Sequence, residues 1–302
     1  MVHDEWKRRD FFRLAASGAV VLGGTAFAAA CTQAPQSGGQ GGGSALERAK
    51  KAGTIKVGIA GEIPYGYTEG GNVTGESPEV AKAVFKNIGI AKVEATQVEF
   101  KQLIPALAAQ QFDMVAAGMA ILPSRCKQAA FSAVDYVTPT AFLVPKGNPK
   151  QVLSFEDIKA KGVNLAVLSG TVEQQVAKAT GIPDSQLQTY DGQPQMLQAL
   201  QANRAYAGAL TDISLKALLK QNPGAALEVT NGFVPVVQGK KQIQAGGFVF
   251  RKSDSDLVTA FNTELAKLHQ NGQWLEIVKP FGFTKDNLPP ADVTTEQLCS
   301  GS

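Results

Sequence analysis

Apolar and polar positions alternate with two different periods along residues 54–235, which predicts strands and helices in turn. In residues 77–89, for example, Val80 and Val84 share one face of a helix. This alternation is typical of an α/β fold with largely parallel sheets. The predicted strands are residues 54–60, 94–100, 112–120, 164–170, 186–192 and 205–212, and the predicted helices are residues 77–89, 101–111, 171–181, 193–204 and 213–224.

The pattern repeats, so the chain contains two blocks of similar organisation, residues 54–138 and 150–235. An extended apolar segment follows each block, as expected if the chain leaves one lobe, builds a second and returns. We therefore expect two hinge crossings, at residues 138–144 and 244–250. A cleft between two such lobes is the expected ligand site, and hinge motion would close it. The predicted lobes are residues 46–138 plus 250–302, and residues 145–243.

Residues 1–30 have the organisation of an export signal, with basic residues first, then an apolar segment and small residues before Cys31. The pair Arg8-Arg9 followed by two Phe residues resembles a twin-arginine signal, and "AFAAAC" resembles a lipobox. We expect Cys31 to carry lipid and to anchor the protein to the outer face of the cell membrane. An uncleaved anchor helix, or a plain signal with an incidental Cys, is the alternative. Residues 31–45 are rich in Gly, Ser and Gln, which is typical of a flexible linker.

The composition is that of an ordinary soluble globular protein, with 44% hydrophobic and 18% charged residues. The net charge of +3 is small. A nucleic-acid-binding domain would usually show a clustered basic face, so no nucleic-acid partner is expected. No Cys/His spacing typical of a zinc site occurs, and we expect neither a metal nor a cofactor.

Two cysteines remain after Cys31, namely Cys126 and Cys299. In an exported protein such a pair is expected to form a disulfide, although two unpaired thiols are the alternative. In the chain-entropy model, closing so long a loop stabilises the fold by roughly 4–5 kcal/mol. The disulfide would hold the C-terminal tail beside Arg125.

The order of these features resembles the type II periplasmic binding proteins of ABC importers, in the polar amino acid family 3. The resemblance covers about residues 50–290 and rests on "IKVGIAGEIPYGY", "QQFDMVAAGMAILPSRC", "LSGTVEQQV" and "AGALTDISL", in this order. "GIAGEIPYGY", "AAGMAILPSRC" and the tail "FGFTKDNLPPADVTTEQLC" are more closely similar to ectoine/hydroxyectoine-binding proteins. The resemblance implies a monomer that binds a small zwitterion and delivers it to an ABC permease in the membrane, without catalysis.

Arg125 and Thr171 are the candidates for binding the ligand's carboxylate. A guanidinium can hold a carboxylate through two parallel hydrogen bonds, and the family places an Arg here for that purpose. Thr171 opens a helix in the opposite lobe, where backbone N–H groups favour an anion. The alternatives are a surface Arg and a plain helix N-cap, and the second is compatible with ligand contact.

Four residues are candidates for binding the cationic part of the ligand. The resemblance implies that Glu62 binds ring nitrogens, as in ectoine binders, and that Asp212 pairs with an α-ammonium group, as in amino acid binders. Tyr65 and Phe100 would present aromatic faces to a delocalised cation. The alternatives are a solvated loop acid for Glu62, a helix N-cap for Asp212 and core packing for the two aromatic residues.

Gly118 and Ala120 complete the candidate site at the end of a predicted strand. The ectoine-binding pattern has an aromatic residue two positions after the strand's Gly, where this chain has Ala120. One wall of the aromatic box is therefore missing. Ectoine or hydroxyectoine is the leading ligand, and a polar or cationic amino acid is the alternative.

The sequence offers little for an enzyme active site. Of the two His residues, His3 lies in the signal and His269 on an amphipathic helix, and no Gly-x-Ser-x-Gly motif occurs. A periplasmic dehydratase built on the same fold is a remote alternative, with Glu62 and Asp212 as acid and base. A sensory receptor that binds its ligand without transport is a further alternative.

Overall fold

The computed structural model describes residues 43–301. The predicted export signal, Cys31 and most of the linker at residues 31–45 lie outside the described residues. Within the described part of the chain, no helix is both long and apolar enough to cross a membrane.

The first of two large sheets contains β1 (Thr54–Ile59), β4 (Lys92–Gln97), β5 (Met114–Ala120), β6 (Ala130–Phe131), β7 (Tyr136–Thr138) and β15 (Gln244–Phe250). The strand order is β4-β1-β5-β15-β6, and β7 also pairs with β15. β1 runs parallel to β4 and β5, whereas β15 runs antiparallel to β5, β6 and β7. β5 and β15 are almost continuously apolar because helices and loops cover both of their faces.

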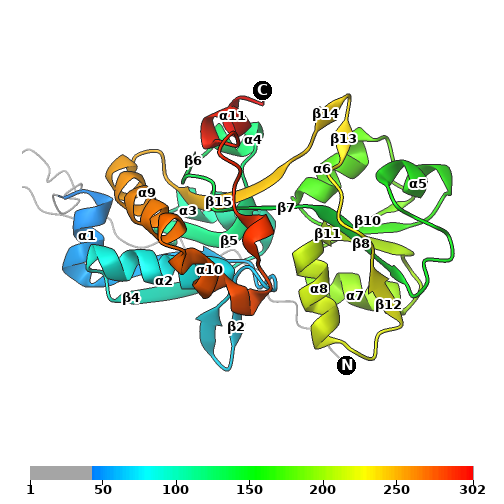
Figure 1. The fold of residues 1–302 in the computed structure, drawn as a ribbon, viewed down its shortest axis with the longest axis horizontal. Helices are drawn as coiled ribbons and strands as arrows, with labels where there is room; N and C mark the ends of the chain where they lie inside the picture. The colour runs from blue at the N-terminus through cyan, green and yellow to red at the C-terminus, as the bar shows by residue number, and fades with distance from the viewer. Residues whose placement is uncertain (1–42, 302) are drawn as a thin grey trace, which may run out of the picture. The chain divides into compact units, whose positions relative to one another are not determined.

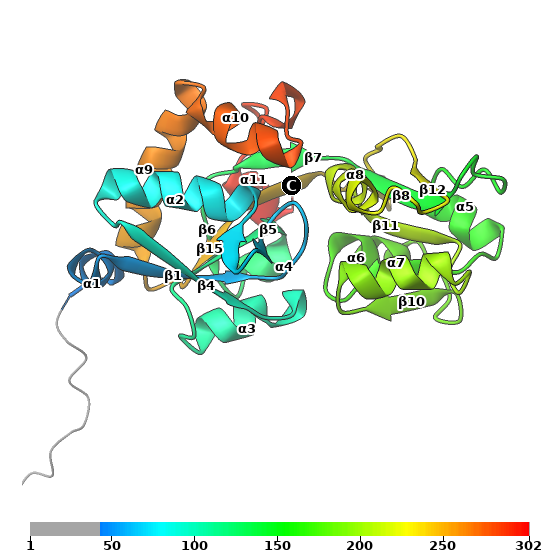
Figure 2. The same cartoon turned by 90° about the horizontal axis from the view of Figure 1, so that it is seen from below.

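Helices cover both faces of the first sheet (Figure 2). On one face lie α1 (Ala45–Ala52), α2 (Glu76–Ile88), α9 (Ser255–Gln270) and α10 (Gln273–Val278). Their apolar sides bury Phe85, Phe261 and Trp274 in one core cluster. On the other face, α3 (Leu103–Ala108) packs over the sheet beside the short helices α4 (Pro123–Cys126) and α11 (Thr295–Ser300).

The second sheet contains β8 (Thr140–Pro145), β9 (Leu165–Leu168), β10 (Leu187–Tyr190), β11 (Ala207–Thr211) and β12 (Leu227–Val229). Its strand order is β10-β9-β11-β8-β12, with β9 parallel to β10 and β11 and with β8 antiparallel to β11 and β12. Separate core clusters fill the two faces of this sheet. The helices that cover it are α5 (Phe155–Ala160), α6 (Val172–Ala179), α7 (Gln193–Gln201) and α8 (Asp212–Gln221).

Smaller elements complete the described chain. Two hairpins consist of β2 (Tyr67–Glu69) with β3 (Asn72–Thr74), and of β13 (Val236–Val237) with β14 (Lys240–Lys241). The short 3-10 helices are η1 (Phe100–Gln102), η2 (Lys279–Phe281) and η3 (Lys285–Asn287).

The predicted α/β class is confirmed, and each block of the sequence forms one sheet with its helices (Figure 1). The predicted hinge ranges 138–144 and 244–250 stay predictions. Residues 140–145 form β8 inside the second sheet, and residues 244–250 form β15 inside the first. The chain passes between the sheets at Pro139 and, on its return, just before Gln244. Each predicted range thus lies at or beside a crossing and also includes strand residues.

Candidate functional site

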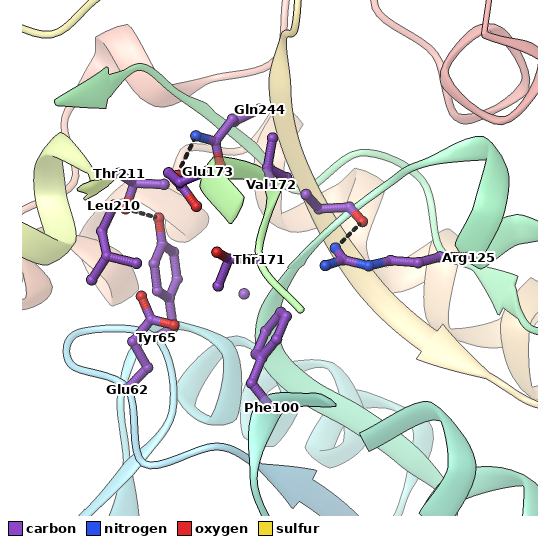
Figure 3. A pocket seen from close by; sticks show the side chains of 12 residues that line it. Glu62, Tyr65, Phe100, Arg125, Thr171, Val172, Glu173, Leu210, Thr211 and Gln244 are labelled. Atoms are coloured by element: carbon purple, nitrogen blue, oxygen red, sulfur yellow. Dashed lines mark hydrogen bonds between the residues drawn. The ribbon is translucent and has the colours of Figure 1, made fainter. Parts of the chain in front are cut away.

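A pocket lies where the two lobes face each other, at the carboxyl ends of strands from both sheets (Figure 3). This is the expected position for a ligand in open α/β sheets. Its cavity volume is about 30 Å³, which is room for one or two water molecules. The lining residues are Glu62, Tyr65, Phe100, Gly118, Ala120, Arg125 and Gln244 from the first lobe, and Thr171, Val172, Glu173, Leu210 and Thr211 from the second.

Arg125 projects into this pocket from α4, the single helical turn that follows β5. Its side chain is buried, and its Nη1 donates to the carbonyl of Ala120 at 2.8 Å. Nη2 donates across the cleft to the carbonyl of Gly170, also at 2.8 Å. Burial lowers the pKa of the guanidinium to about 10, so it stays charged at neutral pH. Because a guanidinium carries five N–H donors, it can bind a carboxylate in addition to these carbonyls.

Phe100 and Tyr65 supply the aromatic faces of the pocket. The Phe100 ring centroid lies 5.3 Å from the guanidinium carbon of Arg125. The Tyr65 ring stacks on Tyr136 at 5.4 Å, and its hydroxyl hydrogen-bonds the hydroxyl of Thr211 at 2.9 Å. Gly118 has φ of 62°, and a Cβ there would overlap the Tyr65 ring. The Gly is therefore required both for its backbone conformation and for the close approach of Tyr65.

Glu62 lies in the loop after β1 and faces the second lobe. Its Oε1 accepts a hydrogen bond from the hydroxyl of Ser214 on α8 at 2.7 Å. Loss of surrounding water raises the pKa of Glu62 to about 7, while the Ser214 hydrogen bond opposes this rise and the carboxylate of Glu173 adds to it. The carboxyl group is thus about half ionised near neutral pH, and a cation placed beside it would favour the ionised form.

Thr171 combines the two roles considered for it. Its hydroxyl accepts from the backbone N–H of Gln174 at 3.4 Å and donates to the carbonyl of Leu168 at 2.9 Å, so it is the N-cap of α6. It also lines the pocket, opposite Arg125.

Glu173 and Gln244 are pocket residues that the sequence did not reveal. The side-chain amide of Gln244 donates to Glu173 and to Thr140, both at 2.6 Å, which joins the start of β15 to α6 and β8. Burial raises the pKa of Glu173, and the positive charge of Arg125 works in the opposite direction. An acid in the first turn of a helix is ordinarily exposed and interacts favourably with the helix dipole. The position of Glu173 therefore did not indicate that its side chain is buried. The sequence also did not reveal Val172, Leu210 and Thr211, because they continue ordinary helix and strand patterns.

Asp212 is not among the residues that line this pocket. Asp212 begins α8, and its carboxylate pairs with Lys216 one turn further along. Its neighbour Thr211 takes the pocket position at the end of β11. The other carboxylate oxygen of Asp212, Oδ1, is buried and has no hydrogen-bond partner among the described residues, so its role as the acceptor for an α-ammonium group stays a prediction.

Further contacts hold the lobes together around the pocket. The side-chain amide of Gln193 on α7 both accepts from the backbone N–H of Ile63 at 3.0 Å and donates to its carbonyl at 2.8 Å. Lys101 pairs with Glu99 in its own lobe at 3.0 Å and with Asp191 in the other at 2.8 Å. Several of these contacts between the lobes involve groups beside the pocket.

The charges of the pocket favour a ligand that carries both signs. Glu62 and Glu173 supply carboxyl groups and Arg125 supplies one guanidinium, with aromatic rings beside them. Among residues 43–301, no group of His, Cys, Asp and Glu side chains is arranged to hold a metal ion. The predicted disulfide is present, with Cys126 and Cys299 joined directly behind Arg125.

Residues 55–284 match the model of the bacterial extracellular solute-binding proteins, family 3, and the chain belongs to this family. It is 32% identical to the "probable amino-acid ABC transporter periplasmic-binding protein y4tE" of Sinorhizobium fredii, over 84% of this chain and 86% of that protein. It is 31% identical to the arginine-binding extracellular protein ArtP of Bacillus subtilis, over 73% of this chain and 82% of that protein. The crystal structure of EhuB in complex with hydroxyectoine matches with a TM-score of 0.77 and 30% identity, over 85% of this chain and 98% of that one.

Membership in this family confirms the type II periplasmic-binding fold predicted from the sequence. It also establishes the general role of the protein, which is an extracytoplasmic solute-binding protein of an ABC importer. A small ligand and a membrane permease are the partners that this role implies.

Proposed function

We propose that the protein captures ectoine or hydroxyectoine and delivers it to its permease without chemical change. These solutes carry a carboxylate and a delocalised cation on one small ring. The observation that supports this proposal is the opposed placement of Arg125 and Glu62 in the pocket, with Thr171 and Phe100 between them (Figure 3). Arg125 and Thr171 would bind the carboxylate, and Glu62 would bind the ring nitrogens between Tyr65 and Phe100.

The carboxyl groups that line the pocket are those of Glu62 and Glu173, and they lie beside the rings of Tyr65 and Phe100, which suits a delocalised ring cation. The hydroxyectoine complex of EhuB has the same fold at 30% identity, which is consistent with the proposal.

A cationic amino acid such as arginine is the second candidate, and the space around the pocket favours it. Ala120 leaves one wall without an aromatic side chain. A larger chamber of about 560 Å³ adjoins Glu62, and its lining includes the acidic residues Glu99 and Asp191. A longer side chain bearing a guanidinium would fit this chamber by size and by charge.

A thermal-shift panel separates these candidates. The purified protein is heated with ectoine, hydroxyectoine, glycine betaine, arginine, lysine, glutamine or cystine. A ligand that binds the native state alone raises the melting temperature, and the stabilisation grows with the logarithm of the ligand concentration above Kd. We expect the largest rise with ectoine or hydroxyectoine. A rise with arginine alone would establish the second candidate, and no rise with any of them would contradict the proposed function.

We propose that lipid on Cys31 holds the protein at the outer face of the membrane. The support is the "AFAAAC" segment and the Gly-rich linker after it, which would let the binding lobes reach the permease. Replacing Cys31 by Ser should move the protein from the membrane fraction to the soluble exported fraction. Retention of Cys31→Ser in washed membranes would exclude lipid on this residue as the anchor.

A further inference from the structure

The C-terminal helix α11 is covalently joined to the turn that carries Arg125. Cys126 is the last residue of α4 and directly follows Arg125, and its disulfide partner Cys299 lies on α11 with a Cα–Cα distance of 5.6 Å. The two cysteines are 173 positions apart in the sequence. A distant part of the chain is thereby fixed one residue away from the guanidinium that faces the cleft.

The helix α4 cannot hold this position alone. It has four residues, and a helix of one turn is far below the length at which isolated helices are stable. Leu122, its N-cap, provides no side-chain hydrogen bond to the first turn. The position of this turn therefore depends on what packs against α4, and the hydrogen bonds of Arg125 to Ala120 and Gly170 then direct its guanidinium.

The helix α11 provides that packing and is itself well anchored on the first lobe. Thr294 and Gln297 form a capping box at its start, and the hydroxyl of Thr295 donates to the carbonyl of Ser132 at 2.8 Å. Leu298 and the disulfide pack against the apolar cluster beneath β5 and β6. At the end of the helix, Gly301 lies against Pro123, the first residue of α4.

The tail also approaches the second lobe. Lys240 on β14 donates to the carbonyl of Gly301 at 3.2 Å, and Figure 1 shows α11 beside α4 with β14 across from it. Arg125 makes its own cross-lobe hydrogen bond to Gly170. The disulfide-linked pair of helices thus contacts both lobes in this closed arrangement.

We propose that α11 and the Cys126–Cys299 disulfide form a positioning element for Arg125. Cys126 and Cys299 do not touch the ligand; they fix the turn from which Arg125 reaches the carboxylate. The inference rests on the proposed function, in which Arg125 binds that carboxylate. Glu62 and Tyr65 belong to the loop after β1, so we expect their placement to change less than that of Arg125 when the disulfide is removed. Its loss should weaken the hold on the carboxylate while both lobes stay folded.

The test compares the full chain with Cys126→Ser/Cys299→Ser, using calorimetry with hydroxyectoine and, separately, arginine as probes. We expect about tenfold weaker binding of whichever probe the wild-type protein binds, at a temperature well below the melting transition of the variant. The same pair of substitutions is then made in Arg125→Lys protein. In this background the loss of the disulfide should change Kd by less than about twofold. The disulfide acts on binding through Arg125, and Arg125 has already been replaced.

Two further measurements test the same positioning role without the Cys126→Ser/Cys299→Ser variant, in case that variant folds poorly. Thr295→Val removes an anchor of α11 and keeps the disulfide, and it should weaken binding by about two- to threefold. Wild-type protein reduced with dithiothreitol should lose affinity and regain it on reoxidation.

The outcomes distinguish this inference from the function on which it rests. Unchanged affinity without the disulfide overturns the positioning role, and so does an equal loss in wild-type and Arg125→Lys backgrounds, which would indicate a general structural effect. Wild-type protein that binds neither probe contradicts the proposed function instead.

Discussion

Replacing Arg125 by Ala should weaken binding of the carboxylate-bearing ligand by at least about 30-fold, as expected when one member of a buried charged pair is removed. The ligand's carboxylate would remain buried between Thr171 and the space left by the guanidinium, without its principal partner. The loss should also include the cross-lobe hydrogen bond to Gly170, which helps to hold the closed arrangement. Isothermal titration calorimetry measures the change directly.

Two control variants define what this loss means. Arg125→Lys keeps the charge but not the paired donors, so we expect intermediate affinity. Lys127→Ala removes an exposed cation two residues away and should leave Kd within about twofold of wild type, as is usual for surface changes. If Arg125→Ala bound the ligand as tightly as the wild-type protein does, Arg125 would not be the carboxylate-binding residue.

The affinity for the cationic part of the ligand should depend on pH through Glu62. This carboxyl has a pKa raised to about 7 in the closed protein, and only its ionised form pairs with a cation. Binding should therefore be tightest above pH 8. Kd should rise about tenfold between pH 8 and pH 6. Below pH 6 it should rise by about tenfold for each pH unit, as expected when one ionisation is linked to binding.

The sign follows from the protonation change on binding. A bound cation lowers the pKa of Glu62, so binding near pH 7 releases a proton, and added protons oppose it. Calorimetry in two buffers of different ionisation enthalpy detects this release. The ligand's own carboxylate stays ionised over this range and adds no dependence.

Glu62→Gln is the matched test of this dependence. The variant keeps the shape of the side chain and cannot titrate, so its Kd should vary little between pH 6 and pH 8. The second buried carboxyl, Glu173, faces Arg125 and Gln244 and remains in the variant, so any residual dependence measures its contribution. Glu99→Gln alters an exposed acid paired with Lys101 and should keep the wild-type profile. A wild-type Kd independent of pH would contradict the role of Glu62.

The sheets and most of the pocket could be predicted because both depend on local pattern. Buried strands such as β5 and β9 are short apolar runs, and residues directly after such strands converge at the carboxyl edge of a sheet. Arg125, Glu62, Tyr65 and Thr171 all line the pocket for this reason. The family pattern added the chemistry of each position.

The remaining features depend on packing between segments that are far apart in the sequence. At the end of β11, Thr211 lines the pocket, whereas its neighbour Asp212 pairs with Lys216 on α8. Glu173 is a buried pocket residue, and its hydrogen-bond partner Gln244 lies far away in the sequence. Neither arrangement leaves a periodic signal.

The central claim is that the cleft binds ectoine or hydroxyectoine through groups from both lobes. Calorimetric titration of the purified protein with hydroxyectoine at pH 8, beside the same ring bearing a carboxamide in place of the carboxylate, tests it most directly. We predict saturable binding of one molecule of hydroxyectoine per chain, and affinity for the carboxamide lower by at least about 30-fold, since Arg125 would lose its charged partner. Equal affinity for the two compounds, or no binding of hydroxyectoine, would contradict the account.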